Sequence, residues 1–167
     1  MKKRLLIATI ILVVFAFLYL LYSSFSKIEE KRQFSSQIKS LPKPSSFQWI
    51  GNKPFLNNHE TIILFFHPDC EHCHYEAKSI ASQLSQFEKV NIWWISSAEK
   101  KAIQSFSIEY QLNKVSNHYF AYLPIQSTSK TFGSITVPHI FIYNEDQILL
   151  KEFKGETKIE ALKKYLN

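Results

Sequence analysis

Both cysteines of the chain lie in one short segment, FFHPDCEHCHYE, at residues 65–76. Cys70 and Cys73 have the C-x-x-C spacing. Three histidines lie in the same segment: His67, His72 and His74. This pattern suits three chemistries, which are a redox-active disulfide, a haem attached through C-x-x-C-H, and a metal site. The location of the protein and the elements that present the motif must decide among them.

A long apolar run follows the N-terminus. The 18 residues at positions 5–22 are apolar except for Thr9. As a helix they would extend about 27 Å, which is close to the hydrocarbon thickness of a bilayer. The run exceeds the usual signal-peptide core of about 7–15 residues, and no small-x-small cleavage site follows it. We therefore expect residues 1–22 to form an uncleaved signal anchor with a transmembrane helix.

Charge predicts the orientation of this anchor. Lys2, Lys3 and Arg4 precede the run without any acidic residue, whereas residues 27–32 mix three bases with two acids. Positive charge stays inside, so a single-pass protein of the bacterial cytoplasmic membrane is expected, with its domain on the extracytoplasmic (periplasmic) side. Three of the six net positive charges belong to the N-terminus, and no basic run interleaved with aromatics indicates nucleic-acid binding.

The remaining sequence predicts a linker and one α/β domain. Residues 23–46 are polar, end in Pro42 and Pro44, and are expected to be a stalk. Residues 47–167 carry alternating strand and helix patterns. Strands are predicted at 47–50, 61–66, 90–96 and 118–124, and in a hairpin at 138–155. Helices are predicted at about 70–87, 98–112 and 157–166, with a short helix or turn at 127–135. This order predicts a mixed central sheet with helices on both faces.

The arrangement of these elements resembles the thioredoxin fold. A buried strand runs directly into C-x-x-C at a helix start, and Val137-Pro138 later opens a hairpin. Within that fold the chain is similar to the membrane-anchored, extracytoplasmic TlpA-like thiol–disulfide oxidoreductases. Glu76 stands six residues after the first cysteine, where that group often carries a glutamate. Pro138 stands at the position of the family's cis-proline.

Two departures from the family pattern affect the chemistry. Leu64 replaces the buried aspartate that is typical of cytoplasmic thioredoxins. Glu71 and His72 stand between the cysteines, where relatives carry Gly-Pro or Glu-Pro. Glu76 or a histidine must therefore handle any proton relay.

The resemblance implies a role for each residue of the motif. Cys70, at a helix N-terminus, would be the nucleophilic thiolate, and Cys73 would resolve the mixed disulfide. Glu76 would exchange a proton with Cys73; the alternative is an ordinary solvated glutamate of the helix. A cis-Pro138 would hold the Val137 backbone beside the disulfide, where it can pair with an extended substrate.

The residues between the cysteines leave the redox direction open. Protonated His72 would favour an oxidising disulfide, and Glu71 opposes it; both would contact substrate. The TlpA-like resemblance implies the reducing direction, with exported thiol or disulfide proteins as substrates and a transmembrane electron donor. It implies no cofactor beyond the Cys70–Cys73 disulfide and no metal.

Two rival interpretations remain. A haem at C-x-x-C-H would lack an axial methionine, because Met1 is the only methionine, and would need a second histidine such as His118 or His139. A copper site would use Cys70, Cys73 and one nearby histidine. Of the remaining histidines, we expect His118 to lie in a loop and His139 to line a surface or substrate groove.

Overall fold

The computed structural model describes residues 12–26, 38–55 and 59–166, and the chain divides into two units, 1–36 and 37–167. In the first unit, residues 12–26 form a helix whose large apolar side chains are exposed. No helix within the described ranges combines the length and the apolar character needed to cross a membrane. Residues 5–11 of the predicted transmembrane run lie outside the described residues.

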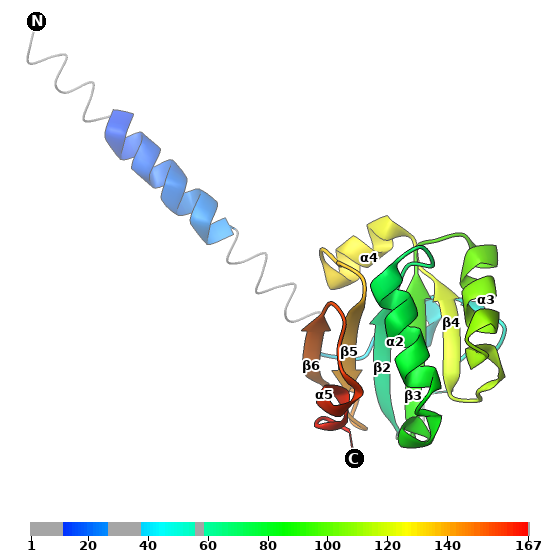
Figure 1. The fold of residues 1–167 in the computed structure, drawn as a ribbon. Coiled ribbons are helices and arrows are strands. Elements are labelled where there is room, and N and C mark those ends of the chain that lie inside the picture. The colour runs from blue at the N-terminus through cyan, green and yellow to red at the C-terminus, as the bar shows by residue number, and fades with distance from the viewer. Residues whose placement is uncertain (1–11, 27–37, 56–58, 167) are drawn as a thin grey trace, which may run out of the picture. The chain divides into compact units, whose positions relative to one another are not determined.

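The second unit is built on a six-stranded sheet with the strand order β1-β4-β3-β2-β5-β6 (Figure 1). The strands are β1 (Gln48–Ile50), β2 (Glu60–Phe65), β3 (Val90–Ser96), β4 (His118–Tyr122), β5 (His139–Tyr143) and β6 (Leu149–Lys154). β2, β3 and β4 are parallel, whereas β1 pairs antiparallel with β4, β5 with β2, and β6 with β5. The predicted mixed sheet is confirmed.

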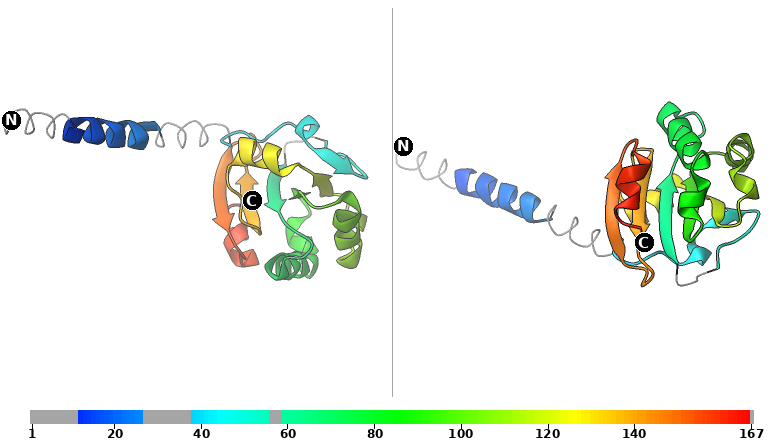
Figure 2. Two further views of the ribbon diagram at one scale, coloured as in Figure 1. Left: turned by 90° about the horizontal axis from the view of Figure 1, so that it is seen from above. Right: turned by 60° about the horizontal axis from the view of Figure 1, so that its bottom comes forward.

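Helices cover both faces of this sheet. They are α2 (Glu71–Ala81), α3 (Lys100–Glu109), α4 (Ile125–Phe132) and α5 (Ile159–Lys163), with short 3-10 turns η1 (Pro44–Ser46), η2 (Leu84–Phe87) and η3 (Leu112–Lys114). α2 and α3 lie on one face and α4 on the other, as the view from above in Figure 2 shows. α5 is shorter than the predicted 157–166 helix, because it begins after Lys158, whose backbone is extended, and already ends at Lys163.

β2 forms the centre of the core. All six of its residues are buried, as its continuous β-branched and aromatic sequence predicts. On one face, Phe66, directly after β2, packs on Phe106 of α3 with 4.5 Å between ring centroids. On the other face, Phe65 packs on Phe132 of α4 at 4.7 Å. Burial of each such side chain contributes about 1.5–3 kcal/mol, so the loop that follows β2 starts from a firmly held strand.

The predicted stalk ends earlier than expected. Residues 38–46 belong to the second unit, where Ser40 bridges Ile148 and Leu41 N–H donates to the Gln147 carbonyl over 2.8 Å. Ile38 and Leu41 are buried and hold this segment against the domain. The predominantly polar composition of the segment did not indicate this packing. Residues 27–37 of the predicted stalk lie outside the described residues.

Candidate active site

The sheet brings the two halves of the C-x-x-C site together. β2 ends at Phe65, five residues before Cys70, and β5 begins at His139, directly after Pro138. Phe65 and His139 are paired across the antiparallel β2–β5 ladder. The cysteine loop and the Val137-Pro138 peptide therefore leave the same end of the sheet on neighbouring strands.

Cys70 is the N-cap residue of α2, which places its sulfur at the start of the helix. Its backbone carbonyl accepts from Cys73 N–H at 2.9 Å and His74 N–H at 3.1 Å, which closes the first turn. The side chain is half-buried, and its Sγ lies 3.8 Å from the Val137 carbonyl oxygen. Cys70 is therefore the sulfur that a partner molecule can reach.

Cys73 lies one turn later and is fully buried. Both sulfurs are free thiols. Burial is the main cause that raises the pKa of the Cys73 thiol, with further contributions from the Cys70 side chain and the negative charge of Glu76. Cys73 thus needs help to lose its proton before it can act as a nucleophile.

Glu76 is buried beneath the cysteines, three residues beyond Cys73 on α2. Burial raises its pKa to about 7, and Glu156 adds to the rise, although the hydrogen bond from Thr157 N–H opposes it. That bond is 2.9 Å long and ends on Oε2, while Oε1 has no partner among the described residues. A carboxyl group with this pKa can both accept and return a proton near neutral pH.

The Val137–Pro138 peptide bond is cis, in the arrangement that the family resemblance implies. The Pro138 carbonyl accepts from Gly155 N–H at 2.8 Å. The Val137 carbonyl faces the Cys70 sulfur. The peptide therefore presents backbone atoms beside the reactive thiol, as a strand-like substrate would require.

The two residues between the cysteines differ in their contacts. Glu71 is exposed in the first turn of α2. His72 is also exposed, and its Nδ1–H donates to Glu156 Oε2 over 2.8 Å. The sequence singled out His72 but not its partner, since the two residues are 84 positions apart.

His74 does not offer a free ring nitrogen for a haem or a metal. Its Nε2–H donates to the Pro68 carbonyl at 2.6 Å, and Tyr110 O–H donates to its Nδ1 at 2.6 Å. The ring also packs near Phe106 at 5.1 Å. His74 therefore acts as a brace between the cysteine loop and α3.

His139 is not the surface or groove residue that we predicted. Only 2% of it is exposed, and its Nε2–H donates to Glu152 of β6 over 2.7 Å. Burial lowers the pKa of its imidazole, although Glu152 opposes this effect. Among the described residues, no three His, Cys, Asp or Glu side chains converge in a way that could hold a metal ion.

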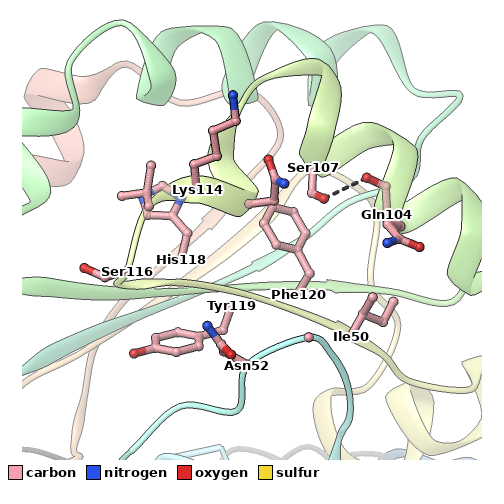
Figure 3. A pocket seen from close by; sticks show the side chains of 12 residues that line it. Ile50, Asn52, Gln104, Ser107, Lys114, Ser116, His118, Tyr119 and Phe120 are labelled. Carbon is pink, nitrogen blue, oxygen red and sulfur yellow. Dashed lines mark hydrogen bonds between the residues drawn. The ribbon is translucent and has the colours of Figure 1, made fainter.

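A pocket of about 400 Å³ lies away from the cysteines, at the N-terminal end of β4 (Figure 3). Tyr119 and Phe120 point to opposite sides of the strand there. His118, predicted to lie in a loop, is buried in β4; its Nδ1 accepts from Trp94 Nε1–H at 3.2 Å. Burial lowers the pKa of His118 to about 4, so this pocket holds a neutral imidazole near neutral pH.

Sequence reasoning missed the short segment Gly155, Glu156 and Thr157, which contacts Pro138, His72 and Glu76. Its only local signal is Gly155, which has a φ of +85°. The other contacts join positions more than 80 residues apart and leave no periodic pattern in the sequence.

Comparison with solved structures identifies the fold of this chain. No protein-family model matches the chain, and no curated protein matches its sequence. A secreted Mycobacterium tuberculosis disulfide oxidoreductase homologous to E. coli DsbE has a similar structure, with a TM-score of 0.57 and 19% identity over 74% of this chain and 88% of that one. The chain has the thioredoxin fold.

Two further structures share this fold. A thiol-disulfide isomerase from Corynebacterium glutamicum matches with a TM-score of 0.60 and 14% identity, over 75% of this chain and 92% of that one. Arabidopsis thaliana ScoI with copper bound matches with a TM-score of 0.51 and 12% identity, over 65% of this chain and 82% of that one. The identities are low, so the chemistry of this chain must be argued from its own residues.

Proposed function

We propose that this protein is an extracytoplasmic thiol–disulfide oxidoreductase of the TlpA-like kind, which acts on exported proteins through Cys70 and Cys73. The observation that carries the proposal is the pairing of a reachable Cys70 at a helix start with a buried Cys73 that has Glu76 beside it. The apolar run at residues 5–22 supports a single-pass anchor in the cytoplasmic membrane, with the domain on the outer side.

The reaction runs in two steps in the reducing direction. The Cys70 thiolate attacks one sulfur of a substrate disulfide, forms a mixed disulfide, and releases the other substrate sulfur as a thiolate. Cys73 then loses its proton to the Glu76 carboxylate, and its sulfur attacks Cys70 Sγ. The bond from Cys70 to the substrate breaks, and the second substrate thiolate leaves. Two electrons have passed to the substrate, and the protein holds a Cys70–Cys73 disulfide.

The Val137–Pro138 peptide prepares the site for an extended substrate. The cis Val137–Pro138 peptide offers its carbonyl 3.8 Å from the Cys70 sulfur. A substrate backbone that pairs with Val137 would bring its own sulfur toward Cys70 in a defined orientation. A reductant of this kind must regain two electrons from another dithiol, and a transmembrane donor is the partner that suits an anchored domain.

The experiment that tests this function is the reduction potential of the full chain in detergent, measured by thiol trapping in defined redox buffers. A value near about −270 mV would support a reductant, and one near about −120 mV would support an oxidant of the same fold. Absence of a reversible two-thiol couple would overturn the oxidoreductase proposal in either direction.

Copper handling is the second candidate function, because a neighbour in the same fold was solved with copper bound. It would use Cys70, Cys73 and a nearby histidine such as the half-exposed His67, whose side chain would have to move toward the cysteines, because no three such side chains converge among the described residues. Titration of the reduced chain with Cu(I) against a competing chelator distinguishes the two candidates. Loss of tight 1:1 binding in both cysteine variants and in His67→Ala would favour copper, whereas equal binding by His67→Ala and wild type would exclude this site.

A further inference from the structure

One short segment touches three parts of the candidate active site. Gly155 N–H donates to the Pro138 carbonyl over 2.8 Å, and Thr157 N–H donates to Glu76 over 2.9 Å. Between them, Glu156 accepts from His72 over 2.8 Å. Three consecutive residues thus join the cis-proline peptide, the buried carboxyl group and the residue between the cysteines.

The orientation of Glu156 is fixed by its neighbours. Gly155 adopts φ +85°, and the Thr157 hydroxyl donates to the Gly155 carbonyl over 3.1 Å, which closes a tight turn around Glu156. Both flanking N–H groups are bound to the site. The carboxylate of Glu156, although partly exposed, is therefore held against His72 of α2.

We propose that Glu156 is a positioning residue of the dithiol site, which pairs with His72 and lowers the electrostatic potential around Cys70 and Glu76 so that the protein is a reductant. This inference rests on the proposed oxidoreductase function, and it identifies a residue that favours the reducing direction of electron transfer.

The charge of Glu156 shifts the balance between the reduced and disulfide forms in a definite direction. The thiolate is the form of Cys70 that exchanges disulfides, whereas the disulfide form carries no charge there. A negative charge at Glu156 disfavours the thiolate and cancels the positive charge of a protonated His72. It therefore favours the disulfide form of this protein, which means that it strengthens the protein as an electron donor.

Glu156 acts on the acid–base group as well. The titratable groups that interact with Glu76 among the described residues are Cys73 on its own helix and Glu156 on the facing segment. Both are electrostatically coupled to Glu76, and the charge of Glu156 favours its protonated form. Removal of that charge lets Glu76 ionise at lower pH, and the pH profile of the step that uses Cys73 must move with it.

The test compares Glu156→Gln with wild type in the full chain, in detergent. We expect the equilibrium constant with glutathione to shift roughly two- to fivefold toward the reduced dithiol, the size of a partly exposed ion pair. We also expect the pH profile of mixed-disulfide resolution to move to lower pH. Glu160→Gln removes the same charge from the exposed first turn of α5 and is expected to change neither quantity.

Two more variants keep the test decisive if Glu156→Gln folds poorly. His72→Gln removes the other partner of the pair, so in buffers acidic enough to protonate the imidazole of the wild type the equilibrium is expected to shift in the opposite direction, toward the disulfide. Glu156→Asp keeps the charge and is expected to restore most of the wild-type equilibrium.

The outcomes separate this inference from the proposed function. A wild-type protein with a reversible two-thiol couple, in which Glu156→Gln and Glu160→Gln behave alike, would overturn the role of Glu156 and leave the oxidoreductase intact. An equal effect of Glu156→Gln in wild-type and His72→Gln backgrounds would overturn the part of the proposal that runs through His72. A wild-type protein without a couple would overturn the proposed function itself.

Discussion

At the scale of single residues, the two cysteines differ in access. Cys70 is half-buried beside the Val137 carbonyl, whereas Cys73 is fully buried. Cys70→Ser should abolish disulfide exchange, and Cys73→Ser should accumulate Cys70-linked mixed disulfides because no second sulfur can resolve them. Non-reducing gels of cells that express each variant measure the trapped adducts. Full exchange activity in Cys70→Ser would contradict the mechanism.

Glu76 makes the free energy of unfolding depend on pH, and the direction of this dependence follows from its raised pKa. Its pKa rises from an ordinary 4.5 to about 7 on folding, so the native state holds this proton more tightly than the unfolded chain does. The free energy of unfolding should therefore fall as pH rises from about 4.5 to about 7, by up to about 3 kcal/mol from this group. Urea denaturation in nonionic detergent measures it.

Glu76→Gln is the matched control for that dependence. The amide oxygen can still accept from Thr157 N–H, but the side chain no longer titrates. The fall in stability between these pH values should shrink in this variant, and resolution of mixed disulfides should slow. A wild-type decline that Glu76→Gln leaves unchanged would assign the dependence to other groups.

At the scale of elements, the segment after β6 can be tested through its glycine. Gly155 and Gly51 have φ of +85° and +83°, and a Cβ at either position would meet open space. Alanine should cost each about 1 kcal/mol of stability through backbone strain alone. Only Gly155→Ala should also slow exchange by several-fold, since only Gly155 donates to Pro138. Equal exchange rates in the two variants would remove this segment from the site.

Local sequence patterns predicted the helices and strands, but they did not predict the contacts between residues far apart in the sequence. The strand at 61–66, the helix that starts at Cys70 and the hairpin after Pro138 have strong periodicity or clear turn residues, and all three are present. His139 was misplaced because a histidine after proline suggests a polar surface, whereas its burial depends on Glu152 across the hairpin. The pairing of His72 with Glu156 depends on tertiary structure alone.

At the scale of the whole molecule, the anchor proposal can be tested in cells. The apolar run at residues 5–22 and the charges before it predict that Cys70 faces the extracytoplasmic side. A membrane-impermeant maleimide should label Cys70 in intact cells, and deletion of residues 2–22 should release the protein from the membrane. Cys73→Ser controls for the site of labelling. Labelling that requires permeabilised cells would reverse the predicted orientation.

Because Cys73 is buried, the domain can form a disulfide bond with only one substrate protein at a time. A protein with two reachable sulfurs could bond to two clients together and cross-link them. Here the second sulfur meets only Cys70, so each domain can form a covalent complex with a single client and must release it before engaging another. Many copies of such a domain could work side by side on crowded, cysteine-bearing proteins without joining them into disulfide-linked aggregates.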